Sequence, residues 1–543
     1  MRATRPLALA AAAALLAGCG GGAGDGRDGP GGASRGSASP AAPRSGGAWI
    51  PGFLADMSLE EKVGQLFVPA FSGRADADRM IGKYHVGGLI YFPADLSTPA
   101  RTAAQSNRFQ RASKIPLLLG VDEEQGLVSR TPFVTRFPGN MALGATGRPD
   151  DARDQARVTG SELRAVGINQ DYAPVADVNV DPRNPVIGVR SFGSDPALVS
   201  RMLQAAIGGY QSAGVAATAK HFPGHGDTST DSHTGLPVID HTRAQWERID
   251  APPFKAAIAS GVDAIMSAHI VVPRLDRSGD PSTLSKTVLT GLLRRDLGYQ
   301  GVIVTDSLQM AGAREKYGDS ATPVRAVNAG ADQLLMPPSL PRAYKAVLKA
   351  ARSGKIPAKR IDEAVTRILR LKEARGLFRD ARADPKRAAA AIGTGASKAT
   401  ARRVAEHAVT LVRNDRDLLP LKGKKVYVSG PKSDVLTSAL RRQGVRTTSL
   451  GAADVAVLTT VNAGSATAAR VRSLGAKPVV VAALGRPYDL DRAAGAAASL
   501  AAYSSSAVSV KALARVLTGR VKPTGKLPVR AGGEPVGHGL TYK

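Results

Sequence analysis

The strongest constraint on the fold is an alternation of short apolar segments with amphipathic helical segments, which continues to about residue 337. Helical patterns separate most of the apolar segments, as in 150–167 and 195–214. The apolar segments are 63–71, 86–92, 115–122, 168–178, 214–222, 262–270, 301–307 and 331–337. Eight strand–helix repeats predict an α/β fold built on a parallel (β/α)8 TIM-like barrel. An open, doubly wound sheet is the alternative, but no G-x-G-x-x-G motif follows a strand.

The barrel is predicted to occupy residues 49–378. Ser58 and Glu61 have the spacing of a capping box and open its first long helix, and the helical pattern 360–378 closes it. A polar linker, 379–400, is expected next. Residues 401–543 contain further buried strand patterns with helices, so they predict a C-terminal α/β sandwich domain, in which no catalytic cluster is visible.

The first 48 residues have the pattern of an export signal followed by a tether. Residues 1–19 combine basic residues, a short apolar run and the ending Leu-Ala-Gly-Cys, which resembles the bacterial lipobox and predicts lipidation of Cys19. A plain secretory signal is the alternative. Residues 20–48 are rich in Gly, Ser and Pro and predict a flexible tether. We therefore expect an extracytoplasmic lipoprotein held to the membrane by its N-terminal lipid anchor.

The chain is strongly basic, with a formal net charge of +28. Aromatic residues make up only 4% of it and do not alternate with basic runs, which argues against a nucleic-acid partner. The excess of basic over acidic residues is largest in 386–543, which contain 26 Lys and Arg but only 8 Asp and Glu. This distribution favours a basic surface that faces an anionic surrounding such as membrane or wall polymer.

Polar side chains follow several of the predicted strands at their carboxyl ends. They are Asp122, Lys220, His221, His269 and Asp306. The carboxyl ends of barrel strands meet on one face, which is where such barrels hold their active sites. We therefore expect these distant residues to share one pocket.

The loop KHFPGHGDTSTDSHTGLP, 220–237, holds three of the eight histidines in the chain. A metal site is one interpretation, but Pro223 and Gly224 prevent the helical i, i+4 placement that aims two imidazoles at one ion. A structural role for the histidines is the second, and it is favoured for His225 taken alone. The third is proton transfer, because Asp231 can accept the imidazole N–H of His233 and so favour its protonated form. No metal or other cofactor is expected.

Asp306 lies at the end of the apolar segment 301–307 and is a candidate nucleophile for an anomeric carbon, with helix capping as the alternative role. A nucleophilic carboxylate facing a histidine acid/base suits the retaining, two-step route of glycoside cleavage.

Four segments together resemble glycoside hydrolase family 3, in its β-N-acetylglucosaminidase branch. They are MSLEEKVGQLF, NPVIGVRSFGSD, KHFPGHGDTSTDSHTGLP and GVIVTDSLQM, and the similarity runs from about residue 50 to the end. The resemblance implies that Asp306 is the nucleophile, His233 the acid/base and Asp231 its orienting partner. It also implies sugar-binding roles, which fall on Asp122, Arg130, Arg190, Lys220 and His221.

One segment departs from the family pattern: Gln125 stands where a glycine is usual, and Leu127 where an arginine is usual. Both changes are expected on the leaving-group side of the pocket. The expected activity is that of a retaining exo-β-N-acetylglucosaminidase acting on small GlcNAc-terminated glycans, either cell-wall fragments or chitooligosaccharides. The alternatives are a β-N-acetylglucosaminide phosphorylase, a β-glucosidase and an inactive sugar-binding lipoprotein.

Overall fold

A computed structural model describes residues 47–232 and 235–542 of the chain. The predicted signal segment with Cys19, and all of the predicted tether except its last two residues, lie outside the described residues. His233 also lies outside them. Within the described part, no helix is both long and apolar enough to cross a bilayer.

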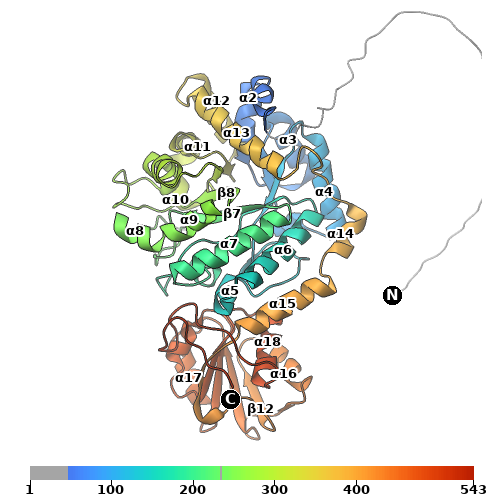
Figure 1. Ribbon diagram of the computed structural model, residues 1–543, viewed down its shortest axis with the longest axis vertical. Helices are drawn as coiled ribbons and strands as arrows, with labels where there is room; N and C mark the ends of the chain where they lie inside the picture. The colour runs from blue at the N-terminus through green and yellow to red at the C-terminus, as the bar shows by residue number, and fades with distance from the viewer. Residues whose placement is uncertain (1–46, 233–234, 543) are drawn as a thin grey trace, which may run out of the picture. The chain divides into compact units, whose positions relative to one another are not determined.

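The first large domain is a curled parallel sheet surrounded by helices (Figure 1). Six strands pair in one sheet in the order β2-β3-β6-β7-β8-β9, and β1 pairs with β10. Single parallel bridges from Ala70 to Ile90 and from Val304 to Gln333 connect the two sheets. The strands are β1 (Phe67–Val68), β2 (Gly88–Ile90), β3 (Leu118–Val121), β6 (Gln170–Asp171), β7 (Ala216–Phe222), β8 (Ala264–Ser267), β9 (Val302–Val304) and β10 (Leu334–Leu335). Each of the eight predicted apolar segments contains one of these strands, and the TIM-like α/β prediction is confirmed.

Alternation of side chains along these short strands creates two cores. Val68, Ile90, Tyr172, Met266, Val304 and Leu335 form one buried cluster inside the curled sheet. Their neighbours in sequence, including Leu89, Ile265 and Ile303, belong to the larger cluster beneath the helices. Successive residues of a strand point to opposite faces, so strands buried on both faces are continuously apolar.

The helices that cover the sheet begin and end with ordinary local signals. The helix α2 (Leu59–Gln65) begins with the predicted capping box, in which Ser58 and Glu61 exchange hydrogen bonds. The predicted helical patterns correspond to α6 (Pro149–Ala165), α7 (Pro196–Ser212) and α13 (Ala358–Ala374). The others in this domain are α1 (Ile50–Ala55), α3 (Gly73–Tyr84), α4 (Pro99–Ala112), α5 (Asn140–Thr146), α8 (Arg243–Ile249), α9 (Ala251–Ala259), α10 (Ala311–Arg314), α11 (Gly318–Ala329), α12 (Leu340–Arg352) and a π-helix, Thr287–Asp296.

The segment predicted as a linker, 379–400, is largely helical. It contains α14 (Pro385–Ala391) and the start of α15 (Gly395–Ala408), which Asp384 and Thr394 cap. Asn107 ties it to the barrel, because its side chain exchanges two hydrogen bonds with the backbone of Ala383, of 2.7 and 2.8 Å. Alanine has the highest helix propensity, which favours helix in this alanine-rich segment between the two domains.

The C-terminal domain is a six-stranded mixed sheet in the order β11-β16-β15-β14-β12-β13. The strands β12 (Lys425–Ser429), β14 (Val455–Thr460) and β15 (Val479–Ala483) are the predicted parallel strands. The remaining strands are β13 (Arg446–Thr447), β16 (Ala498–Ala501) and β11 (Thr410–Asn414), of which only β11 runs antiparallel to its neighbour. Its helices include α16 (Ser433–Arg441), α17 (Ala466–Ser473) and α18 (Ala507–Leu517).

A shared core joins the barrel to the C-terminal domain. Met141, Ala142 and Ala145 of α5 belong to the same buried cluster as residues of β14 and β15. Lys526 N–H donates a 2.8 Å hydrogen bond to the carbonyl of Ala145. Gly144 lies close to both domains, because a Cβ there would lie 1.7 Å from the carbonyl oxygen of Phe192 in the barrel and 3.2 Å from Cβ of Pro528 in the C-terminal domain. Loops of both domains therefore border common cavities.

Candidate active site

A pocket of about 540 Å³ opens at the carboxyl ends of the barrel strands. Of the predicted site residues, the ones that line it are Asp122, Arg130, Arg190, Lys220, His221, Asp231 and Asp306. Glu124, which sequence analysis did not single out, also lines it. The structure therefore brings together residues that lie far apart in the chain, as the barrel topology predicts.

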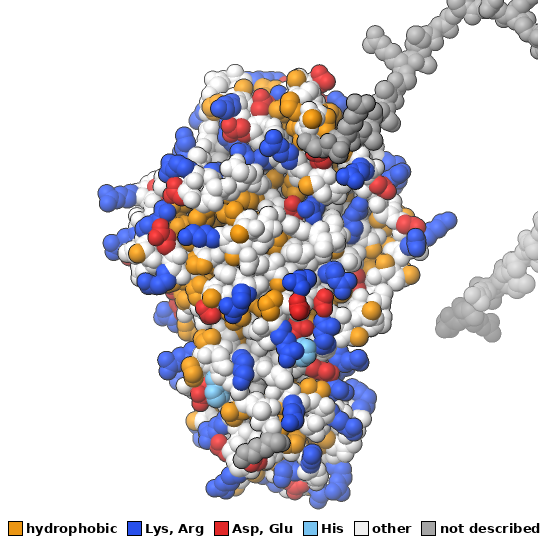
Figure 2. Space-filling view, in the orientation of Figure 1, with side chains coloured by type: hydrophobic (Ala, Val, Ile, Leu, Met, Phe, Trp, Pro, Cys, Tyr) orange, Lys and Arg blue, Asp and Glu red, His pale blue; other side chains and the backbone are white. Residues whose placement is uncertain are grey.

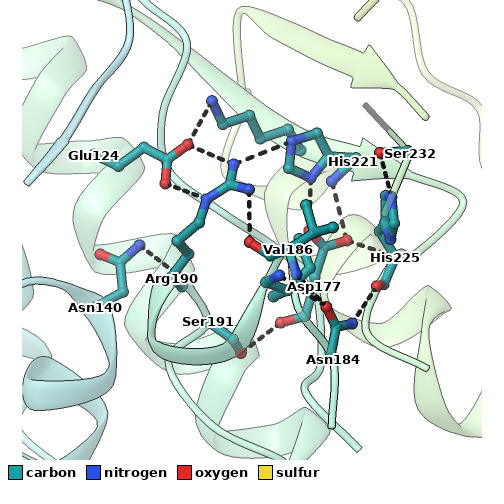
Figure 3. Close-up of polar contacts among 12 residues, drawn as sticks. Glu124, Asn140, Asp177, Asn184, Val186, Arg190, Ser191, His221, His225 and Ser232 are labelled. Carbon is teal, nitrogen blue, oxygen red and sulfur yellow. Dashed lines mark hydrogen bonds and ion pairs between the residues drawn. The ribbon is translucent and has the colours of Figure 1, made fainter. Parts of the chain in front are cut away.

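Two cations and two carboxylates form a largely buried network on one wall of the pocket. Figure 3 shows the contact between Arg190 and Glu124 in this network. The guanidinium of Arg190 donates to both oxygens of Glu124, at 2.8 and 2.7 Å. The Lys220 ammonium lies 2.7 Å from Glu124 and 2.8 Å from Asp122. Bidentate Arg–carboxylate pairs fix geometry as well as charge. This network holds polar groups in fixed positions on the wall of the pocket.

The electrostatics of the network keep its buried members ionised. Burial by itself raises the pKa of the Glu124 carboxyl, but the charges of Arg190 and Lys220 outweigh burial and lower it. Burial likewise acts to lower the pKa of the Lys220 ammonium, and the charges of Asp122 and Glu124 raise it instead. Each charge is therefore stabilised by its partners, and the loss of one partner leaves a buried charge uncompensated.

Asp177 organises the first part of the 220–237 loop. Its carboxylate accepts a hydrogen bond of 2.7 Å from Nδ1 of His221 and two more from the backbone N–H groups of His221 (3.1 Å) and His225 (2.8 Å). The Nε2 atom of His221 lies 3.4 Å from Nη2 of Arg190. Asp177 stands near the carboxyl end of a predicted apolar segment, 168–178, and this position is the signal that could have revealed it.

His225 lines the pocket, but its contacts favour the structural role predicted for it when it is considered alone. It is buried, its Nε2 lies 2.9 Å from Oγ of Ser232, and its carbonyl accepts a hydrogen bond from Asn184 (Figure 3). Burial lowers the pKa of His225 to about 4, so its imidazole is neutral near pH 7. Its contact with Ser232 ties the start of the loop to the residue next to Asp231.

His241, which lies just beyond the loop, connects the loop to the helices that follow it. His241 lies 2.8 Å from Asp227 through Nε2 and 2.6 Å from Asp250 through Nδ1. Hydrogen bonds to these two carboxylates raise the pKa of His241 to about 10. The imidazolium therefore connects Asp227, within the loop, to Asp250, at the junction of α8 and α9.

Asp306 lies just after β9, with its side chain partly exposed to the pocket. Its Oδ1 accepts a 2.7 Å hydrogen bond from the N–H of Ser307. Burial acts to raise the pKa of this carboxyl, but the imidazoles of His221 and His269 and the Ser307 N–H lower it below its ordinary value. The next helix, α10, is capped by Met310, so Asp306 does not serve as its N-cap.

Two of the predicted site residues, His269 and Arg130, do not take part in the buried contacts of the pocket wall. His269 does not line the pocket: it lies beneath, fully buried, between Thr283 Oγ1 (2.8 Å) and the carbonyl of Ser307 (2.9 Å). Arg130 lines the pocket but is exposed, with no ion-pair or hydrogen-bond partner for its side chain among residues 47–232 and 235–542. His269 therefore contacts the backbone next to Asp306, whereas Arg130 is free to bind a ligand.

Comparison with known proteins identifies the family. Residues 58–371 match the Glycosyl hydrolase family 3 N terminal domain, and residues 443–534 match the Glycosyl hydrolase family 3 C-terminal domain. The chain belongs to glycoside hydrolase family 3. The resemblance seen in the sequence is thus confirmed, and the protein is a glycoside hydrolase by family.

Several known proteins are similar to this chain in sequence. The β-N-acetylglucosaminidase/β-glucosidase of Cellulomonas fimi is 36% identical over 69% of this chain and 68% of its own length. The β-hexosaminidase A of Pseudoalteromonas piscicida is 37% identical over 64% of this chain and 62% of its own length. The β-hexosaminidase LpqI of Mycobacterium tuberculosis is 36% identical over 67% of this chain and 96% of its own length.

Two solved structures superimpose closely on this chain. The β-N-acetylglucosaminidase from Paenibacillus sp. str. FPU-7 has a TM-score of 0.80 and 37% identity, covering 87% of this chain and 99% of that one. The β-glucoside phosphorylase BglX has a TM-score of 0.81 and 26% identity, and the match covers 90% of this chain and 97% of that one.

The two departures from the family 3 pattern have different surroundings. Gln125 is buried with a φ of 66°, and its side-chain amide bonds to Thr135, Phe137 and Thr159, so it lines neither the pocket nor its rim. Leu127 is 72% exposed and does line the pocket. Leu127 alone therefore changes the surface that a ligand meets.

The described part of the site offers no arrangement for a metal ion. Among residues 47–232 and 235–542, no three His, Cys, Asp or Glu side chains are grouped as metal ligands. His221 instead bonds to Asp177 and His225 to Ser232, and His241, which follows the loop, lies between Asp227 and Asp250.

Proposed function

We propose that this protein is a retaining exo-β-N-acetylglucosaminidase that removes terminal GlcNAc from wall fragments or chitooligosaccharides. The observation that carries the proposal is the state of the pocket carboxylates. Asp122 and Glu124 are ion-paired with Lys220, whereas Asp306 makes no ion pair within the described residues and has a lowered pKa. Asp306 is thus an ionised carboxylate with a lone pair available to attack an anomeric carbon.

In the first step, the Asp306 carboxylate forms a bond to C1 of the sugar. The glycosidic C1–O bond breaks as the leaving oxygen takes a proton from His233, the proposed acid, which Asp231 orients. In the second step, the same histidine removes a proton from water, whose oxygen attacks C1 and releases Asp306. The carboxylate stabilises the positive charge that develops at C1 in both transition states.

The sugar is proposed to bind against the wall formed by Asp122, Arg190, Lys220 and His221, with Arg130 at the rim. Charged groups held by one another cannot rearrange as substrate enters, so the hydrogen bonds to ring hydroxyls are preorganised. The choice of GlcNAc is supported by the β-N-acetylglucosaminidase names of relatives that are 36–37% identical.

The enzyme is proposed to act outside the cytoplasm, anchored to the membrane by lipid on Cys19. The N-terminal pattern and the basic charge support this location, and Lys and Arg side chains are spread over most of the face visible in Figure 2. A role in peptidoglycan turnover follows from this position. Metabolic labelling with a fatty acid, comparing the native chain with Cys19→Ala, tests the anchor directly.

The activity is tested by incubating the enzyme with 4-nitrophenyl β-GlcNAc and 4-nitrophenyl β-glucoside side by side. Preferential release from the GlcNAc substrate is expected, and NMR should show the β-anomer as the first product, as double displacement requires. An α-anomer would exclude the retaining route. Tight GlcNAc binding without turnover would instead support a sugar-binding lipoprotein. Unchanged rates after exhaustive chelation would exclude a metal mechanism.

A phosphorylase is the second candidate, favoured by the structural similarity to the β-glucoside phosphorylase BglX. A histidine acid/base repels phosphate less than a carboxylate does, so phosphate could replace water in the second step. Formation of GlcNAc-1-phosphate in phosphate buffer, with faster turnover than in its absence, would establish this alternative over hydrolysis.

A further inference from the structure

A second cavity, of about 300 Å³, lies beside the candidate active site. Leu127, Pro185 and Val186 line both cavities, so the two share a wall. The far side of the second cavity is formed by loops of the C-terminal domain, and the guanidinium of Arg486 reaches across to the carbonyl of Pro185 at 3.4 Å. The second cavity is therefore next to the space into which a substrate longer than one sugar would extend over this wall.

The C-terminal loops that line this cavity follow the carboxyl ends of four neighbouring parallel strands. Lys432 follows β12, Asn462 follows β14, Arg486 follows β15, and 504–506 follow β16. The chain crosses from β12 outward to β13 and then back to β14 on the other side of β12, so the strand order reverses between β12 and β14. Open α/β sheets bind ligands at the carboxyl ends of their strands, at such a reversal.

The cavity is positively charged. Lys432 and Arg486 line it, and none of the described residues that line it is acidic. Neither side chain forms an ion pair within the described parts of the chain. Asn462 accepts a 2.9 Å hydrogen bond from the backbone N–H of Arg486 and so fixes the loop that carries it. Gly188 leaves room for the guanidinium, because a Cβ there would lie 3.2 Å from its Nε.

The shared wall is apolar next to these cations. Leu127 is 72% exposed, an unusual position for a large apolar side chain, and with Pro185 and Val186 it offers a surface against which the apolar face of a sugar ring can pack. A ligand that matches the cavity therefore carries a sugar ring and, beyond it, an anionic group.

We propose that this second cavity binds the leaving-group part of the substrate and that Lys432 and Arg486 bind a carboxylate on it. Arginine and lysine recognise carboxylates through charge-assisted hydrogen bonds, which a neutral sugar cannot form. This inference rests on the proposed β-N-acetylglucosaminidase function and narrows its substrate class. The preferred substrate is GlcNAc linked to an acidic sugar, not a neutral chitooligosaccharide.

The test compares two disaccharides in which GlcNAc is β-1,4-linked to a sugar with a lactyl group. One carries the free carboxylate and the other its methyl ester, so that only the charge differs. For the full-length enzyme we expect kcat/KM to be about tenfold higher for the acid than for the ester. In the double variant Lys432→Gln, Arg486→Gln this ratio should fall to about one. The ratio in the native enzyme should also shrink with added salt.

The matched control is Arg472→Gln, which removes an exposed cation on α17 that does not line the cavity and should leave the ratio at its native value. An equal kcat/KM for acid and ester in the native enzyme, or a ratio that survives in the double variant, would overturn the proposal. Formation of GlcNAc-1-phosphate that depends on Lys432 and Arg486 would overturn it too, by assigning these cations to phosphate.

Calorimetric binding of the same acid and ester to the Asp306→Ala variant separates this proposal from the proposed function. Acid binding about tenfold tighter, lost on adding the two Gln substitutions, supports the cavity assignment even when no hydrolysis is found. Equal binding of acid and ester, alongside measurable GlcNAc release by the native enzyme, contradicts the cavity assignment and leaves the proposed function standing.

Discussion

The carboxylate of Asp177 holds His221 by both its ring and its backbone: Oδ2 lies 2.7 Å from Nδ1, and Oδ1 accepts the His221 N–H at 3.1 Å. The same Oδ1 also accepts the N–H of His225 at 2.8 Å. One buried side chain thus sets both the imidazole orientation and the path of the loop that follows. The hydrogen bonds to Asp177 therefore fix the orientation in which the His221 ring faces the pocket.

Replacing Asp177 by Asn should therefore affect both activity and stability. We expect kcat/KM to fall about 10- to 100-fold as His221 loses its fixed orientation. The free energy of unfolding should fall by about 2 kcal/mol, because charge-assisted hydrogen bonds are lost at a buried site. Urea unfolding and steady-state kinetics measure the two effects. The control Asp240→Asn, which removes an exposed ion pair with Arg274, should change unfolding by under about 0.5 kcal/mol.

Glu124→Gln should destabilise the fold by about 3–5 kcal/mol, since it leaves the charges of Arg190 and Lys220 uncompensated in a buried network. Thermal and urea unfolding measure the loss. Glu247→Gln removes an exposed i, i+4 pair with Arg243 and should cost only about 0.3–0.5 kcal/mol. A melting temperature for Glu124→Gln equal to that of the control would contradict the assigned role of the network.

Asp306→Ala should lower turnover by more than about a thousandfold, because no other group can form the covalent bond to C1. The fold should persist, since the side chain is partly exposed and, among the residues that the structure describes, its only hydrogen bond is to the adjacent N–H. Because its pKa is lowered from an ordinary value of 3.8, protonation of Asp306 should reduce kcat/KM only below about pH 4. Near-native turnover by the variant would remove the nucleophile assignment.

His233→Ala should slow substrates with poor leaving groups far more than activated aryl glycosides, which depart without a proton. We expect at least a ~100-fold loss on a GlcNAc disaccharide and a smaller first-step effect on the nitrophenyl substrate. Steady-state kinetics on both substrates give the comparison. Equal losses on the two would argue against an acid role, and Thr234→Ala provides a neighbouring control.

His241 should make stability depend on alkaline pH. Its folded-state pKa of about 10 lies above the ordinary value of 6.5, so between these values the folded state binds more protons than the unfolded state. The stabilisation is therefore complete below about pH 6.5 and is lost as pH rises towards 10. Urea unfolding of the native chain and of His241→Gln between pH 6 and 10 should converge with rising pH. A constant difference would show that the bridge to Asp227 and Asp250 does not depend on charge.

Periodicity made the fold predictable. A strand buried on both faces must be apolar, and a helix on its outside must be amphipathic, so the repeat of these patterns indicated the barrel directly. The same topology predicted that Asp122, Lys220, His221 and Asp306 share one face. The helices within the predicted linker were not foreseen, because α14 is only 7 residues long and packs against α4, a tertiary contact that local charge does not reveal.

The sequence by itself determined the barrel, the residues at the ends of its strands and the family. Only the tertiary structure decided how those residues pair. Asp122 and Lys220 are 98 positions apart, Glu124 and Arg190 are 66 apart, and Asp177 and His221 are 44 apart. A pattern along the chain shows which side of an element faces the core, but charge pairing at a few ångströms depends on side-chain geometry that exists only after the strands have come together.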